Sequence, residues 1–297
     1  MRRTPVLDLG ATDLGLDASV GTVAVKLDML QPTGSFKVRG ATSLLSALDV
    51  PASGVVAASG GNFGLAIAWA ARRLGHRATV VVPASSPAEK IEPIRELHAT
   101  VVVVDGYYAA AADEARRQVA DTGAVAAHAY DQPAVVAGQG TATRELLADA
   151  ELDTILIACG GGGLLAGAVA AAAGDVRIVA VETEGTPTLH AAVAAGRPVD
   201  VEVSGLAASS LGARRIGGHA WAVRDRIAAL ALVDDAAVRD AQARLWRAAR
   251  IVAEPAGAIG LAALSSGAYR PQPGERVGVV VCGANTDPGS VVAPLTA

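Results

Sequence analysis

Short runs of β-branched residues alternate along this chain with longer, alanine-rich segments. Most of the runs are continuously apolar, which is typical of strands covered on both faces, as in a parallel sheet. Alanine has the highest intrinsic helix propensity, so the segments between the runs are expected to be helices. The expected strands are Val23–Leu27, Val55–Ala58, Thr79–Val82, Thr100–Val104, Ala124–Ala127, Thr154–Ala158, Val176–Val181 and Val277–Val281.

Alternation of strands and helices favours open α/β sheets whose parallel strands are joined by right-handed crossovers. We therefore predict an α/β fold with two open, twisted, mostly parallel sheets flanked by helices. Residues 40–127 are expected to form a small domain inserted into a large domain of residues 1–39 and 128–297. The expected helices are Phe36–Leu48, Phe63–Leu74, Pro87–His98, Tyr107–Ala120, Val135–Ala148, Leu164–Ala173, Ala236–Ala249 and Ala256–Ser265.

The composition restricts the class of function. A chain with 52% hydrophobic and 18% charged residues is not intrinsically disordered. With 25 basic and 29 acidic residues, it has no basic excess for binding nucleic acid. The longest apolar run, Leu164 to Ala173, is too short to cross a membrane. Cys159 and Cys282 suit a reducing compartment, and no signal-peptide pattern is visible, so we expect a cytoplasmic protein without nucleic-acid or membrane partners.

The segment PTGSFKVRG, residues 32–40, places Lys37 near an expected helix start. The positive end of a helix disfavours an ammonium group, so the neutral amine of Lys37 would form more easily. A neutral amine is the nucleophile of Schiff-base chemistry. Spacing alone favours the alternative, in which Lys37 is an ordinary solvated lysine.

The segment Ser59-Gly60-Gly61-Asn62-Phe63-Gly64 follows an expected strand and opens an expected helix. Backbone N–H groups, a hydroxyl and an amide at such a turn can hold an anion, for example a substrate carboxylate. An ordinary turn, capped by Ser59 or Asn62, is an equal alternative.

Four consecutive glycines, Gly160–Gly163, lie between an expected strand and an expected helix. Each glycine costs backbone entropy, so packing alone does not explain the run. The run would let N–H groups close around a phosphate at the helix N-terminus, but no Walker lysine follows it. A second interpretation is an NAD-dependent oxidoreductase, because Gly161, Gly163 and Ala166 fit G-x-G-x-x-A and Glu182 ends the next strand.

Other polar residues stand at the ends of expected strands. Cys282 follows an apolar strand at the edge where α/β proteins bind ligands, although a buried inert cysteine is the commoner case. Glu182 could hold a metal or a cofactor, or could begin a helix, and Glu254 before Pro255 fits plain helix initiation. The five histidines show no metal-ligand spacing, and we assign them no role.

Six segments in this order resemble the motifs of the serine/threonine dehydratases, which are fold-type II pyridoxal-phosphate enzymes. The segments are TGSFKVRGA, ASGGNFG, ACGGGGLLAG, VETEGTPTLHAAVAAG, VAEPAGAIGLAAL and VVVCGAN. The last motif has a cysteine rather than a serine, and in this respect it is most similar to the motif of the L-serine dehydratases. The resemblance implies a fold like the tryptophan synthase β-subunit, pyridoxal phosphate as cofactor and a homodimer. It also implies conversion of a small hydroxy amino acid, L-serine and/or L-threonine, to a 2-oxo acid and ammonia. Another fold-type II lyase or synthase is the alternative within the family.

The resemblance also implies roles for individual residues. Lys37 would bind pyridoxal phosphate covalently and act as the base at the substrate α-carbon, and Phe36 would pack against the cofactor ring. Asn62 would donate to the cofactor's 3′-hydroxyl, and Cys282 would face the pyridine nitrogen. The substrate-binding residues would be Ser59, Gly60, Gly61, Asn62 and Phe63, and the phosphate-binding residues would be Gly160, Gly161, Gly162, Gly163 and Leu164.

Two further expectations follow from the resemblance. Relatives often bind a cation near the phosphate loop, and Glu182 matches its carboxylate ligand. Thr188 stands where relatives that bind a divalent ion would have Asp, so we expect a monovalent ion such as K⁺, or none. Serine racemases of this family have a serine at the position of Gly60 that returns a proton to the α-carbon. We therefore expect elimination without racemisation.

Overall fold

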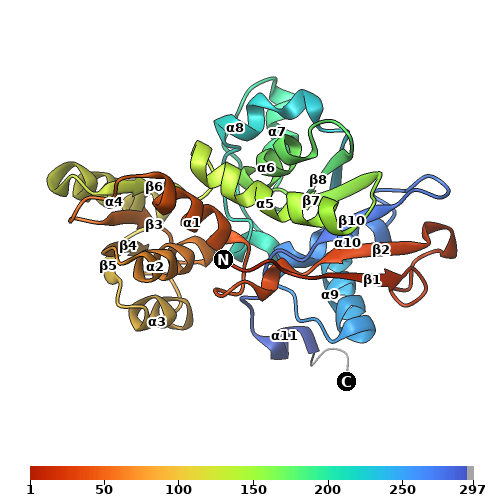
Figure 1. The fold of residues 1–297 in the computed structure, drawn as a ribbon, viewed down its shortest axis with the longest axis horizontal. Helices are drawn as coiled ribbons and strands as arrows, with labels where there is room; N and C mark the ends of the chain where they lie inside the picture. The colour runs from red at the N-terminus through yellow and green to blue at the C-terminus, as the bar shows by residue number, and fades with distance from the viewer. Residues whose placement is uncertain (293–297) are drawn as a thin grey trace. The chain divides into compact units, whose positions relative to one another are not determined.

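The computed structural model describes residues 1–292, and the chain divides into two units, each with a sheet of its own (Figure 1). Unit 1 consists of Met1 and Lys37–Gly138, and unit 2 consists of Arg2–Phe36 and Gln139–Ala297. The sequence prediction placed the two boundaries at residues 39/40 and 127/128. The difference places Lys37 and the segment 128–138 in unit 1.

Unit 1 contains a four-stranded sheet of order β5-β4-β3-β6 in which all neighbours are parallel. Its strands are β3 (Val55–Ala58), β4 (Ala78–Pro83), β5 (Thr100–Val104) and β6 (Val125–Ala127). Its helices are α1 (Lys37–Ala47), α2 (Asn62–Leu74), α3 (Ala88–Glu96) and α4 (Tyr108–Thr122), and α5 (Pro133–Asp149) begins in this unit.

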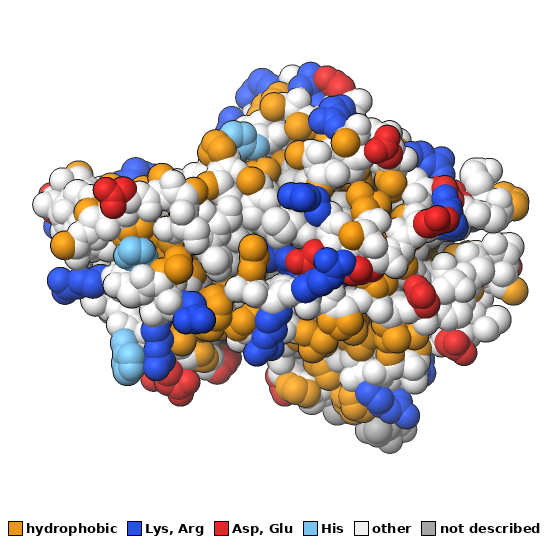
Figure 2. Space-filling view, in the orientation of Figure 1, with side chains coloured by type: hydrophobic (Ala, Val, Ile, Leu, Met, Phe, Trp, Pro, Cys, Tyr) orange, Lys and Arg blue, Asp and Glu red, His pale blue; other side chains and the backbone are white. Residues whose placement is uncertain are grey.

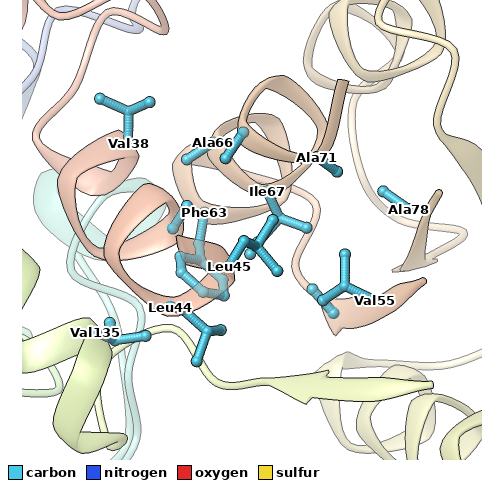
Figure 3. Close-up of a cluster of buried hydrophobic side chains, with 13 residues drawn as sticks. Val38, Leu44, Leu45, Val55, Phe63, Ala66, Ile67, Ala71, Ala78 and Val135 are labelled. Atoms are coloured by element: carbon cyan, nitrogen blue, oxygen red, sulfur yellow. The ribbon is translucent and has the colours of Figure 1, made fainter. Parts of the chain in front are cut away.

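Successive residues of β3 pack against different helices, as expected of a strand covered on both faces. Val55 belongs to a buried cluster with side chains of α1 and α2, whereas Val56 packs with side chains of α4. Figure 3 shows Leu45 of α1 and Ile67 of α2 next to each other in the first cluster, which Trp69 also contacts. This packing fixes the first turns of α1 and α2, which carry Lys37 and Asn62.

Unit 2 contains a six-stranded sheet of order β1-β2-β10-β7-β8-β9, in which only β1 is antiparallel to its neighbour among the described strands. Its strands are β1 (Val6–Gly10), β2 (Thr22–Lys26), β7 (Thr154–Ala158), β8 (Arg177–Thr183), β9 (Ala229–Val233) and β10 (Val277–Val280). Its helices are α6 (Gly163–Ala172), α7 (Thr188–Ala195), α8 (Gly218–Ala222), α9 (Asp235–Ala249), α10 (Pro255–Ser265) and α11 (Pro288–Val292), with short 3₁₀ helices η1–η4 at Ala18–Val20, Asp28–Leu30, Leu206–Ser209 and Arg224–Arg226.

The predicted α/β fold with two mostly parallel sheets is confirmed. The sequence prediction omitted β1 and β9, which are the two edge strands of the larger sheet, and the helices α7, α8 and α11. An edge strand is covered less completely than a central one, so its apolar run is weaker. The β9 sequence ALALV also contains alanine and leucine, which favour helices when considered alone.

Charged side chains of both signs are interspersed on the face shown in Figure 2. None of the helices within residues 1–292 is both long and apolar enough to span a bilayer.

Candidate active site

Lys37 is the first residue of α1, and its side chain is half-buried. Its Nζ donates a hydrogen bond to the carbonyl oxygen of Ala129 at 3.0 Å and lies 5.9 Å from the centroid of the Phe63 ring. The amine of Lys37 is therefore held in place by its own unit, unlike a freely solvated surface lysine. Because Phe63 is the second residue of α2, the amine of Lys37 lies near the start of α2.

The loop of residues 59–61 joins β3 to α2 in the same unit. Its N-cap residue is Gly61, which has no side chain with which to cap α2. The Gly61 N–H lies 3.4 Å from Ser59 Oγ, and this is a long contact. The loop thus offers backbone donors at a helix N-terminus, as an anion site requires.

Gly64 keeps the turn between β3 and α2 tight. A Cβ at Gly64 would collide with the carbonyl oxygen of Ser59 and lie 2.9 Å from Val80 Cγ1. A larger residue would therefore push α2 away from the loop, and a glycine is required here by close approach of the backbone.

The segment after β6, which was given no role from the sequence, is also next to the lysine. Ala129 supplies the carbonyl that accepts from Lys37, and His128 Nδ1 accepts the Asp131 N–H at 3.1 Å. Burial lowers the pKa of His128; the charge of Asp131 opposes this shift and the charge of Lys37 adds to it. No sequence signal pointed to this segment, because a backbone carbonyl makes the contact with Lys37.

The four glycines lie in unit 2, between β7 and α6. Gly162 is the N-cap of α6, has φ +84° and makes no side-chain capping bond. A Cβ at Gly162 would collide with Cβ of Ala220 and lie 2.7 Å from Ile216 Cδ1. Both the backbone conformation and the space require glycine here, and the first N–H groups of α6 have no side-chain cap.

Cys282 and Phe36 also lie in unit 2. Cys282 is buried, and its carbonyl oxygen accepts the Phe36 N–H at 2.8 Å. The neighbouring Ser35 forms an isolated antiparallel bridge with Gly283. Within residues 1–292, the buried hydroxyl of Ser35 has no hydrogen-bond partner. A buried hydroxyl without a protein partner is a group that a bound ligand can satisfy.

Glu182 lies at the end of β8, and its carboxylate caps α7. Oε1 accepts from the Leu189 N–H at 2.7 Å and from the Thr188 hydroxyl at 3.0 Å, and Oε2 accepts from the His190 N–H at 2.8 Å. Burial raises the pKa of Glu182, and these hydrogen bonds oppose the rise. The Thr188 hydroxyl also lies within hydrogen-bond distance of the carbonyl oxygen of Gly160, so the cap is linked to the glycine run. No cluster of three or more potential metal-ligating side chains occurs among the residues that the structure describes.

The predicted site residues therefore form two sets. Unit 1 carries Lys37 and the loop from Ser59 to Phe63, whereas unit 2 carries Phe36, Gly160–Leu164, Glu182 and Cys282. Glu254 is the N-cap of α10 with Pro255 in its first turn, as expected of plain helix initiation.

The chain matches the model of the family described as pyridoxal-phosphate dependent enzyme over residues 1–283. The chain belongs to this family. It is 33% identical to a serine racemase from Oryza sativa subsp. indica over 301 residues, with 97% of this chain and 87% of the relative covered. It is 37% identical to an L-threo-3-hydroxyaspartate ammonia-lyase from Pseudomonas sp, with 96% and 90% covered. A solved threonine deaminase from T.th. is 34% identical, with a TM-score of 0.88 and 96% and 94% covered.

Membership of the pyridoxal-phosphate-dependent family, with its fold-type II architecture, confirms the resemblance seen in the sequence and rules against the dinucleotide interpretation of the glycine run. Glu182, the expected ribose-binding acid of that interpretation, has both carboxylate oxygens engaged at the start of α7. The position of Glu182 at the end of a strand suggested ribose binding. Its carboxylate instead caps α7, and this explains the position.

The residues present fit pyridoxal phosphate. The glycine run leaves the N-terminus of α6 open to a phosphate, Lys37 offers an amine held by a backbone carbonyl, and the buried Ser35 hydroxyl has no partner within residues 1–292.

We predict that Gly162→Ala lowers the free energy of unfolding by about 3 kcal/mol, because left-handed strain and a steric collision add together. Gly174→Ala is the matched control, since Gly174 has φ +96° but nothing within 4 Å of an added Cβ, and about 1 kcal/mol is expected there. Urea unfolding followed by circular dichroism measures both. Equal losses in the two variants would show that the space around Gly162 does not restrict the loop.

Proposed function

We propose that this chain eliminates the β-hydroxyl of L-serine and/or L-threonine and so produces a 2-oxo acid and ammonia. The observation that carries the proposal lies in unit 1, where the Lys37 amine is 5.9 Å from the ring of Phe63, close to the loop 59–61 that leads into α2. A base is thus close to a loop suited to a substrate carboxylate. The similarity to an ammonia-lyase and to a threonine deaminase supports the same reaction class.

The residues of the chain divide the work. The N–H groups of loop 59–62 bind and orient the carboxylate of the amino acid. Lys37 removes the α-proton, and its hydrogen bond to Ala129 keeps the amine in place beforehand. The N-terminus of α6 binds the phosphate of the cofactor. When bound, pyridoxal phosphate supplies the electron sink for the negative charge that develops at the α-carbon.

Cys282 and Asn62 complete the proposed cofactor contacts. Cys282 would face the pyridine nitrogen as a neutral partner, Asn62 would donate to the 3′-hydroxyl and Phe36 would pack on the ring. A neutral partner leaves the electron sink weaker than an aspartate would. Elimination tolerates this, because the β-hydroxyl leaves and the carbanion need not persist.

Racemisation is the second candidate, because the chain is also similar to a serine racemase. Gly60 argues against it, since a glycine has no side chain to return a proton to the α-carbon. Elimination uses one base, whereas racemisation needs a second acid on the other face. We therefore propose elimination as the main reaction. Assays with L-serine and L-threonine distinguish elimination from other fold-type II lyase or synthase reactions.

The homodimer and the cytoplasmic location expected from the sequence stay predictions.

Borohydride treatment of the yellow holoprotein should attach the cofactor covalently to Lys37. Lys26, Lys37 and Lys90 are the lysines of this sequence, and Lys26 is buried with its Nζ on Thr4 and Glu145. Lys37→Ala should reduce formation of 2-oxo acid from L-serine and L-threonine by about a thousand-fold or more, as for loss of an essential base. Lys90→Ala is the control and should retain activity. Mass spectrometry that places the label on Lys90 would refute the assignment.

Residual substrate at partial conversion should contain negligible D-isomer. The reason is the missing side chain at Gly60, and chiral chromatography of the serine left after partial turnover measures it. Accumulation of D-serine at a rate comparable to pyruvate would contradict the role given to Gly60.

The proposal includes a monovalent cation bound near Glu182. Replacing sodium by potassium in the assay should then raise activity, and Glu182→Ala should weaken the response. Thr188→Ala is the control, because it loses a contact of the α7 cap but keeps the carboxylate. Equal activity of the wild type in Tris, sodium and potassium salts would contradict the proposed cation.

A further inference from the structure

The place that a side chain at residue 60 would take is already filled by another residue. A Cβ added to Gly60 would lie 2.5 Å from Ser86 Oγ and 3.1 Å from Ser86 Cβ. Both distances are below ordinary contact, and the nearest atom is a hydroxyl oxygen. Gly60 therefore lacks a hydroxyl of its own, but Ser86 presents one beside the same loop.

The topology of unit 1 explains why Ser86 lies next to Gly60. The strands β3 and β4 are parallel neighbours, with Ala58 opposite Val81, and the Ser59 N–H continues the pairing to the carbonyl oxygen of Val81 at 3.1 Å. The segments after the two strands therefore emerge at one edge of the sheet. Ser86 lies in the turn after β4, where its N–H donates to the carbonyl oxygen of Pro83 at 2.9 Å. Its backbone is thus fixed beside Gly60.

The Ser86 hydroxyl also has capacity for a ligand. The residue is half-buried, and within residues 1–292 its hydroxyl makes no hydrogen bond to the protein. A hydroxyl has one donor and two acceptor positions, so it can bond a bound group without breaking a contact of the fold.

We propose that Ser86 is a substrate-binding residue, which donates its hydroxyl to the carboxylate of the amino acid on loop 59–62. The inference rests on the proposed function, because it takes that loop as the carboxylate site. A side chain at residue 60 would require the Ser86 side chain to shift. The turn after β4 thus provides the hydroxyl that the loop itself does not carry.

Kinetics of Ser86→Ala test the binding role. The carboxylate is present in substrate and transition state alike, so its loss should raise KM about ten-fold for both L-serine and L-threonine and change kcat by less than about three-fold. Ser85→Ala is the matched control, because Ser85 is the exposed neighbour in the same turn, and it should behave like the wild type. An unchanged KM in Ser86→Ala overturns the inference, as does a fall in kcat alone.

A double-mutant cycle tests the packing without using activity. Gly60→Ser should lower the melting temperature of the protein by about 3 °C, because the Ser86 hydroxyl must turn away from the new side chain. In the Ser86→Ala background the same substitution should cost about 1 °C, because only the closer of the two contacts is removed and the Cβ of residue 86 stays. Equal losses in both backgrounds would show that the two positions do not compete for space.

Different results would overturn the proposed function and the role of Ser86. A holoprotein without turnover of any hydroxy amino acid would overturn both the proposed function and the role of Ser86. An active wild type with an unchanged KM in Ser86→Ala would overturn only the role of Ser86. D-serine formed by the wild type and lost in Ser86→Ala would make Ser86 a proton donor and overturn the pure binding role.

Discussion

Packing between α1 and α2 is the interaction on which the unit 1 half of the site depends. Leu45 and Ile67 are fully or almost fully buried in the cluster that joins the two helices to β3. Lys37 begins one of these helices, and the loop from Ser59 leads into the other. The distance between Lys37 and the loop of residues 59–61 is therefore set by a hydrophobic contact, which is short-ranged and tolerates little change in volume.

In unit 2, a glycine and a buried carboxylate determine how two helices begin. The conformation of Gly162 opens the start of α6, and Glu182 fixes the start of α7. Thr188 connects the two, since its hydroxyl lies within hydrogen-bond distance of both the Glu182 carboxylate and the carbonyl oxygen of Gly160. A substitution at Glu182 would thus reach the glycine run through one threonine. The protein's own carboxylate caps the start of α7, whereas the glycine N-cap of α6 has no side-chain cap.

The sequence was informative wherever a residue type is restricted by local chemistry. Four glycines after a strand were recognisable because backbone conformation limits such positions, whereas Lys37 was singled out by the resemblance of its segment to a family motif. The edge strand β9 was not, because its sequence ALALV favours a helix and only pairing with β8 makes it a strand. Ala129 and Ser86 could not have been found either. Their contacts with Lys37 and Gly60 join segments that are apart in the chain, and the contact of Ala129 is made by a backbone carbonyl that any residue possesses.

Tryptophan is rare in this chain, and its distribution follows the two units. Trp69 contacts the α1–α2 cluster, whereas Trp221 and Trp246 belong to unit 2. With Trp221 and Trp246 replaced by phenylalanine, the emission of the remaining indole would report on one half of the chain only. The melting of the lysine-bearing half could then be followed optically apart from the half that carries the glycine run. Fluorescence measurements during unfolding would then show whether the two halves unfold in one step or in two.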